Sequence, residues 1–268
     1  MSMKRPKQST KVLEVYGRGS INDQANLSRR DLNIKGVGAL DLRTCKPDGT
    51  PWDFSKRVDR QQARDLVAAE DPDWIVGSPP CTAFSIWNFA MNFPKMPKER
   101  VDQALAEGRV HLKFMASLYR RQIRRGKYFL HEHPSTALSW KEPEISDLMR
   151  LPYVHSVVAH QCMFGLVTPS SDGGEPMPAM KRTRFMTNSF PMTLRLNRVC
   201  DESHAHQQLV GGRCAQAAFY PLPLVKAILL GIYKRHARCS PGSIPERVRS
   251  PTTSQFHFPI FWRHPFRG

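Results

Sequence analysis

The chain has 268 residues, of which 40% are hydrophobic, and its formal net charge at pH 7 is +17. This length suits one sizeable domain or at most two small ones, and the hydrophobic content is ordinary for a globular core. No run of about 20 apolar residues is present that could cross a membrane, and nothing resembles a secretory leader. We therefore expect an intracellular protein without membrane attachment, nuclear if its source is eukaryotic.

Positive charge is concentrated towards both ends. Residues 1–11 hold four basic and no acidic side chains, and residues 234–268 hold seven basic and one acidic. We expect 1–11 to be a flexible basic arm, 12–233 to fold as the domain, and 234–268, rich in Pro, Ser and Arg, to be a disordered tail. Basic ends on a basic body favour a polyanionic partner such as nucleic acid, through contacts with phosphates.

Short apolar runs alternate with helical patterns between the two ends. Strands are predicted at residues 11–17, 36–42, 73–78, 127–134, 155–161 and 184–189. Helices are predicted at 59–69, 98–124 and 220–235, the last with proline near its start, where the missing N–H is harmless. Strands and helices that alternate predict an α/β fold with a mostly parallel sheet and helices on both of its faces.

Ligands of open α/β sheets bind beyond the carboxyl ends of the strands, so the residues that follow each run are informative. Gly17 and Gly19 follow the first run, and Asp41 follows the second. A glycine turn with an acid about 20 residues later is typical of a site where backbone approaches a nucleotide and the acid binds its ribose. The alternative is a tight strand-to-helix turn with no ligand.

The segment "WIVGSPPCTAFS" places Cys81 behind two prolines at the end of a buried strand. Pro79 and Pro80 restrict the backbone, so they form a stiff platform from which the thiol points in one direction. The six cysteines of the chain lie far apart with no CxxC pair, which argues against a disulfide framework or a zinc ribbon. The alternative for Cys81 is a small buried thiol that only fills space.

Glu132 ends another apolar run, in "FLHEHP". A carboxylate at that position can be partly desolvated, which raises its pKa and lets it hold or donate a proton. A metal site is the alternative, because His131 and His133 lie two residues apart on a strand and can share one face. Its further ligands would be Cys200, His204 and His206.

These pieces resemble the cytosine carbon-5 methyltransferases. The segment "GSPPCTAFS" resembles the Pro-Cys loop of that family, with Phe84 and Ser85 after the nucleophile Cys81 and with Thr82 where Gln is usual. The segment "HEHP" resembles its Glu motif. Residues 182–184 of "KRTRFMTN" resemble its Arg-x-Arg strand.

The resemblance extends from about residue 12 to 233. The segment "QLVGGRCAQAAFYPLPLVKAILLGI" is similar to the family's closing segment beside the cofactor, with Gly212 and Arg213 where the family has Gly-Asn. Glu14 and Tyr16 match the acid and the aromatic residue of the family's first strand, and the glycines match in a register shifted by one. The sequence, especially "GSPPCTAFS" together with "KYFLHEHP", is also similar to methyltransferase-like segments of protist retroelement polyproteins.

This resemblance implies a Rossmann-like methyltransferase fold that transfers a methyl group from S-adenosylmethionine to carbon 5 of cytosine in nucleic acid, DNA in preference to RNA. It implies that Cys81 adds to carbon 6 of the base, Glu132 engages the ring nitrogen and amino group, and Arg184 holds the base carbonyl. Because the base cannot react inside a duplex, it must be flipped or single-stranded. The implied cofactor residues are Glu14, Tyr16, Gly17, Gly19, Asp41, Asp53 and Pro79, and the implied nucleic-acid contacts are Arg182 and Ser85.

Only about residues 190–207 separate the Arg-x-Arg strand from the closing segment, where the family has a long target-recognition region. The resemblance therefore implies weak or no sequence specificity, with binding driven by the basic ends. It leaves open a second possibility, a catalytically inactive, nucleic-acid-binding relic of the same fold from a retroelement.

Overall fold

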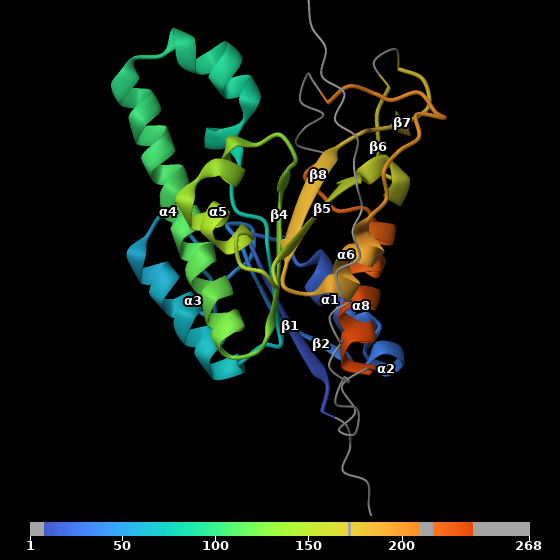
Figure 1. The fold of residues 1–268 in the computed structure, drawn as a ribbon. Helices are drawn as coiled ribbons and strands as arrows, with labels where there is room; N and C mark the ends of the chain where they lie inside the picture. Colours follow the sequence, from blue (N-terminus) through green and yellow to red (C-terminus); the bar gives the residue numbers. More distant parts are fainter. Residues whose placement is uncertain (1–7, 171–172, 210–216, 238–268) are drawn as a thin grey trace, which may run out of the picture. The chain divides into compact units, whose positions relative to one another are not determined.

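A six-stranded sheet forms the centre of the fold (Figure 1). The computed structural model describes residues 8–170, 173–209 and 217–237. In spatial order the strands are β2 (Ile34–Leu40), β1 (Thr10–Val15), β3 (Trp74–Gly77), β4 (Tyr128–Pro134), β8 (Arg182–Thr187) and β5 (His155–His160). The first four are mutually parallel, and β8 runs antiparallel to both of its neighbours.

The sheet confirms the predicted α/β class with mostly parallel strands, and all six predicted strands are present. The sequence pattern did not predict the direction of β8. In the described residues between β5 and β8, 161–170 and 173–181, the chain forms short elements and no long crossover helix. Parallel strands need a crossover connection, whereas antiparallel strands do not, so the short connection accounts for the reversal.

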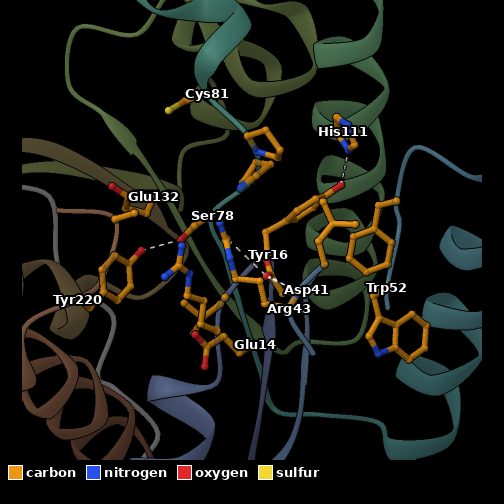
Figure 2. A pocket seen from close by; sticks show the side chains of 18 of the residues that line it. Glu14, Tyr16, Asp41, Arg43, Trp52, Ser78, Cys81, His111, Glu132 and Tyr220 are labelled. Carbon is orange, nitrogen blue, oxygen red and sulfur yellow. Dashed lines mark hydrogen bonds and ion pairs between the residues drawn. The ribbon is translucent and has the colours of Figure 1, made fainter. Parts of the chain in front are cut away.

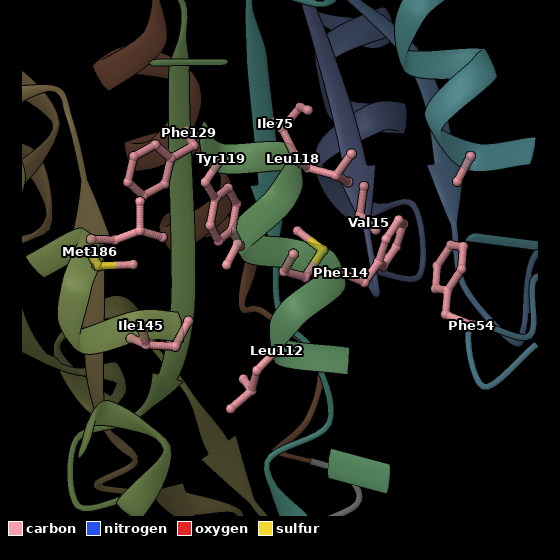
Figure 3. Packing of buried hydrophobic residues seen from close by; sticks show 14 of the residues in the cluster. Val15, Phe54, Ile75, Leu112, Phe114, Leu118, Tyr119, Phe129, Ile145 and Met186 are labelled. Carbon is pink, nitrogen blue, oxygen red and sulfur yellow. The ribbon is translucent and has the colours of Figure 1, made fainter. Parts of the chain in front are cut away.

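Alternate residues of each strand face opposite sides of the sheet and form two apolar cores. One core takes Leu13, Val15, Ile75, Phe129 and Met186 from the strands, and the last four are labelled in Figure 3. The other takes Val12, Trp74, Val76, Leu130 and Phe185. This period of two, with both faces apolar, is what a strand covered by helices on both sides requires.

Helices cover both faces, as predicted (Figure 1). The first core is covered by α3 (Arg57–Glu70), α4 (Lys98–Arg124) and α5 (Pro143–Met149). The second is covered by α1 (Ser20–Leu27), α6 (Phe190–Leu196) and α8 (Leu222–Ala237), and α2 (Arg29–Leu32) follows α1. The predicted helices correspond to α3, α4 and α8. Among the described helices, α1, α2, α5 and α6 were missed because each spans at most eight residues, too few for a clear helical period.

Short elements connect the longer ones. After β3 come η1 (Thr82–Phe84), a π-helical turn η2 (Asn88–Asn92) and η3 (Phe93–Lys95), and η4 (Leu138–Lys141) follows β4. Beyond β5 lie η5 (Gln161–Phe164) and a two-stranded ribbon of β6 (Val167–Thr168) and β7 (Met177–Pro178). We call η5, β6, β7 and the segment 198–209 the small lobe. Backbone bonds from Leu166 to Gln161 and from Gln207 to Pro178 connect its parts.

The predicted domain limits differ from the elements by a few residues. Strand β1 includes Thr10 and Lys11, which we had assigned to the arm, and Lys11 N–H donates to Asp73 Oδ2 at 2.8 Å. Helix α8 continues to Ala237, four residues into the predicted tail. Residues 1–7 of the arm and 238–268 of the tail lie outside the described residues. None of the described helices is both long and apolar enough to cross a membrane.

Candidate active site

A cavity of about 540 Å³ lies at the carboxyl ends of β1 and β3. The chain leaves β1 towards β2 on one side, while β3 and β4 follow on the other, so this edge is the point where the strand order reverses. In open α/β sheets such a point is where ligands bind, and the volume suits a cofactor-sized molecule. Figure 2 shows its lining from β1, β3, β4, α4 and the segment before α8.

The loop after β1 is shaped by Glu14. Its Oε2 accepts the backbone N–H groups of Ile21 at 3.0 Å and Asn22 at 3.2 Å, so the carboxylate caps the start of α1. Burial raises the pKa of Glu14, and these N–H donors act against that rise. A Cβ on Gly17 would lie 2.0 Å from Glu14 Oε1, and Gly19 has a φ of 96°, so both glycines serve the turn itself.

Aromatic rings form one wall of the cavity. Tyr16 has a φ of 59°, in the left-handed region, and its hydroxyl lies 2.8 Å from His111 Nδ1 on α4. The Tyr16 ring contacts Phe54 edge-on with centroids 4.9 Å apart, and Trp52 lies beside Phe54. Burial raises the pKa of Tyr16 and lowers that of His111, so both stay neutral at pH 7. This wall offers a flat apolar surface to a planar ring.

Two acids lie at the same wall. Asp41 Oδ1 accepts the N–H of Arg43 at 3.0 Å, and its side chain is 13% exposed, at the cavity. Asp53 Oδ1 accepts the hydroxyl of Ser55 at 2.6 Å and its N–H at 3.1 Å. The Ser55 hydroxyl is the main reason why the pKa of Asp53 lies below its usual value. Aromatic rings beside carboxylates suit an adenosine, whose base stacks and whose ribose hydroxyls donate to an acid.

The loop that carries Cys81 is held from two sides. On one side Pro79 C=O accepts from Nε2 of His133 at 2.8 Å, while His133 Nδ1 lies 2.6 Å from the hydroxyl of Ser139. On the other, Phe84 is fully buried and its N–H donates to Cys81 C=O at 2.9 Å. Cys81 is partly exposed at the cavity and is not in a disulfide. The loop therefore presents the thiol from a fixed backbone, as its prolines predicted.

Glu132 enters the cavity from the end of β4. Its side chain is 8% exposed, and Lys181 Nζ lies 3.6 Å from Oε1. Within the described part of the chain that buried oxygen has no hydrogen-bond partner. In Figure 2, Cys81, Glu132 and Tyr220 lie on the side of the cavity away from Trp52. A buried carboxylate oxygen without a donor is costly, so it is suited to accept from or donate to a ligand.

The segment before α8 closes the cavity. Tyr220 OH lies 2.6 Å from Ser78 Oγ at the end of β3, and burial raises the pKa of Tyr220 well above its usual value. The Arg18 guanidinium lies over the Phe219 ring, 3.8 Å from its centroid. These contacts place the segment beside the β1 loop. Gly212 and Arg213, singled out in the sequence, lie outside the described residues.

Most of the predicted site residues meet at this cavity. It is lined by Glu14, Tyr16, Gly17, Asp41, Asp53, Pro79, Cys81 and Glu132. Gly19, Ser85, Arg182 and Arg184 are not among the lining residues. The Arg184 guanidinium instead lies 5.3 Å from the centre of the Trp140 ring. The guanidinium of Arg182 lies 4.0 Å from Oε1 of Glu202.

Sequence reasoning missed several residues of the lining. Lys181, adjacent to the Arg-x-Arg strand, is the cation beside Glu132, and its place in the basic run "KRTR" was the available signal. His111 lies in the middle of α4 and Tyr220 before α8, both far from the other site residues in the chain. Tyr220 lies in the segment that the resemblance placed beside the cofactor, although it was not singled out there. No local pattern connects His111 with the strand ends, because only the packing of α4 on the sheet brings it there.

The predicted metal ligands do not form one group. His131 is fully buried, with Nδ1 3.0 Å from Tyr119 OH, and His133 is engaged by Pro79 and Ser139. Burial lowers the pKa of both histidines, so they are neutral groups of the core. In the part of the chain that the structure describes, the side chains of metal-ligand type that lie close together are those of Cys162, Cys200, His204 and His206.

No known family model matches the chain, and no curated protein matches its sequence. The functional argument therefore depends on the geometry of the site and on its chemistry.

Proposed function

We propose that the chain transfers a methyl group from S-adenosylmethionine to carbon 5 of cytosine in nucleic acid. The observation that carries the proposal is the meeting of Cys81 and Glu132, from the ends of neighbouring strands, at a cavity with an acidic aromatic wall. A nucleophile and a carboxylate at one end, and groups suited to adenosine at the other, match a reaction between a base and a nucleoside cofactor.

The cofactor half of the cavity is proposed to hold S-adenosylmethionine, which supplies an electrophilic methyl group when bound. Asp41 would accept hydrogen bonds from the ribose hydroxyls, and Trp52 and Phe54 would contact the adenine. Asp53 is already engaged by Ser55, so we assign it a weaker contribution than Asp41. The carbonyl of Pro79 is occupied by His133, so its part is to position the loop.

In the proposed reaction the Cys81 thiolate forms a bond to carbon 6 of cytosine, and the electron pair of the C5–C6 double bond moves into the ring. Glu132 donates a proton to the ring nitrogen, which neutralises the charge as it develops, and Lys181 supports the resulting carboxylate. Carbon 5 would then take the methyl group from the sulfonium of the bound cofactor, which would leave as the neutral thioether S-adenosylhomocysteine. Loss of the carbon 5 proton to a base restores the double bond and expels the Cys81 thiolate, and the ring nitrogen returns its proton to Glu132.

Exposed apolar side chains follow the Cys81 loop and suit contact with an unpaired strand. They are Ile86, Trp87, Phe89, Met91 and Met96, with Trp87 68% exposed. Lys95, Lys98 and Arg100 lie in the same part of the sequence and are exposed. Bases stack on aromatic side chains while cations contact phosphates, so this segment supports nucleic acid as the substrate.

Cofactor binding is tested first, by calorimetric titration of the purified chain with S-adenosylmethionine. We expect saturable binding that Asp41→Ala weakens by at least about tenfold, the equivalent of about 1.4 kcal/mol. Asp65→Ala, which removes an exposed acid of α3, is the matched control and should bind normally. A chain that is folded by circular dichroism yet binds no cofactor would remove the basis for methyl transfer.

The nucleophile is tested with a single-stranded oligonucleotide that contains 5-fluorocytosine, whose fluorine cannot leave as the carbon 5 proton does. A covalent complex that requires S-adenosylmethionine is expected for the wild type and for Cys45→Ser, which alters an exposed cysteine, and not for Cys81→Ser. If the chain binds the oligonucleotide but neither binds cofactor nor forms the complex, the inactive relic becomes the better proposal, with the exposed segment after Cys81 as its binding surface.

A further inference from the structure

We propose that the small lobe binds one structural zinc ion through Cys162, Cys200, His204 and His206. One ligand atom from each of these residues lies within 4.8 Å of every other. Two cysteines and two histidines are a set that zinc prefers in structural sites, where four protein ligands surround it completely. The proposal is independent of methyl transfer, because none of the four residues lines the cavity between β1 and β3.

The distances fit a tetrahedral ion. With Zn–S and Zn–N bonds of about 2.3 and 2.0 Å, a tetrahedral angle puts the sulfur and nitrogen ligand atoms about 3.5 Å apart. Cys200 Sγ lies 3.7 Å from His204 Nε2 and 3.5 Å from His206 Nε2. No pair of the four ligand atoms is more than 4.8 Å apart, about 1.3 Å beyond the tetrahedral sulfur–nitrogen distance, so a modest side-chain rotation would bring them onto one ion. The four ligand atoms are therefore spaced closely enough to surround one zinc ion.

The backbone already arranges the ligands. Glu202 has a φ of 63°, so the chain turns back on itself between Cys200 and His204, and Glu202 N–H donates to Cys200 Sγ at 3.3 Å. Cys162 lies in η5, which begins directly after β5. Three ligands come from one turn and one from a distant segment, so an ion here joins two parts of the chain. The N–H bond to sulfur also fixes the orientation of the ligand.

The small lobe has a structural need for such a bond. Phe164 of η5 packs in the second sheet core, but the separate apolar cluster beside the lobe has only Leu166, Ala179 and Ala217 as buried members among the described residues. A core of this size contributes little, and small units usually depend on a metal or a disulfide for stability. Two thiolates balance the charge of Zn²⁺ while the histidines bind as neutral rings, so the buried cysteines would not be left with an unpaired charge.

Zinc content is measured on the full chain purified with a reducing agent and without chelator. We expect about one zinc per chain by elemental analysis, and about one Co²⁺ per chain after exchange, with the visible absorption of tetrahedral cobalt and a thiolate-to-cobalt charge-transfer band. No zinc and no cobalt spectrum would overturn the proposal. So would a Cys162–Cys200 disulfide found by mass spectrometry that persists in the reducing agent.

Variants then assign the ligands. Cys200→Ser and His204→Gln should weaken Co²⁺ binding on the order of 10–100-fold or more. Cys45→Ser and His155→Gln change the same residue types outside the cluster and should bind as the wild type does. Equal binding in all four variants would overturn the assignment.

A third variant covers the case in which loss of a ligand prevents folding. His206→Cys keeps four ligands and adds a thiolate, so it should still bind one Co²⁺ with a stronger charge-transfer band per ion. An unchanged band in this variant would place His206 outside the site.

Discussion

The central sheet buries two extended clusters of apolar side chains, whereas the separate apolar cluster beside the small lobe has three buried members, and the lobe carries four side chains of the metal-ligand type. The sheet is therefore stable through hydrophobic contacts that many residues share, while the lobe depends on a few specific bonds. The cavity lies in the first region, where rigid strand ends position Cys81 and Glu132. We therefore expect the stability of the sheet that forms the cavity to be separable from the stability of the lobe.

The largest effect is expected from the core of the sheet. Phe129 is fully buried and its ring stacks on Tyr119 with centroids 4.5 Å apart. We expect Phe129→Ala to lower the free energy of global unfolding by about 3–5 kcal/mol, because it removes a large apolar contact and leaves a cavity. Leu166→Ala should change global urea unfolding far less, because Leu166 packs in a small cluster that is separate from the two sheet cores. Equal shifts of one common transition would show that the two regions unfold together.

Zinc removal is expected to affect the lobe and spare the sheet. At a free zinc concentration 100 times the Kd, binding raises the free energy of opening of the lobe by about 2.7 kcal/mol. Chelation should therefore lower amide protection in residues 161–168 and 198–207 by on the order of 100-fold, with little change in β1 and β3. Hydrogen exchange with mass detection measures both regions in one sample. Uniform loss of protection across the chain would contradict the separation.

The sheet should lose stability in acid through its buried histidines. Burial lowers the pKa of His131 and His133 from their usual 6.5 in the folded state, so below pH 6.5 the unfolded chain binds protons that the folded chain does not. Stability is complete above pH 6.5 and falls as the pH drops towards the folded pKa values, by up to about 1.4 kcal/mol per pH unit for each histidine.

Denaturant unfolding between pH 7.5 and 5 measures this slope. His131→Gln should reduce the slope of unfolding free energy against pH by the contribution of one histidine, up to about 1.4 kcal/mol per pH unit. His155→Gln, on the edge strand β5, is the control. A slope in the His131→Gln variant equal to that of the wild type would mean that His131 is not the titrating group.

The smallest effects compare one glycine from each region. Gly19 precedes α1 with a φ of 96°, and Gly165 ends η5 with a φ of 77°. A Cβ meets nothing closer than 3.4 Å at Gly19 or 3.9 Å at Gly165, so the cost of alanine is mainly that of the left-handed backbone, about 1–2 kcal/mol. Gly19→Ala should lower the free energy of global unfolding, whereas Gly165→Ala should lower only the local amide protection of the lobe. The reverse result would contradict the independent stability of the two regions.

The sequence by itself determined the strands, the long helices and the position of Cys81. These features depend on neighbours along the chain: apolar runs define β1 to β4, helical spacing defines α4, and consecutive prolines stiffen the loop before the thiol. Strand ends also predicted that Gly17, Asp41, Cys81 and Glu132 would meet, because parallel strands bring their carboxyl ends to one edge.

Tertiary structure alone decided the rest. The direction of β8, the partnership of Lys181 with Glu132 and the separation of His131 from His204 all depend on contacts between distant segments. Cys162 joins the other ligands only because η5 packs beside the 198–209 segment, 38 residues from Cys200 in the chain. Side-chain periodicity records which face is buried and not which segment covers it, so these pairings emerge only when the sheet and its helices pack together.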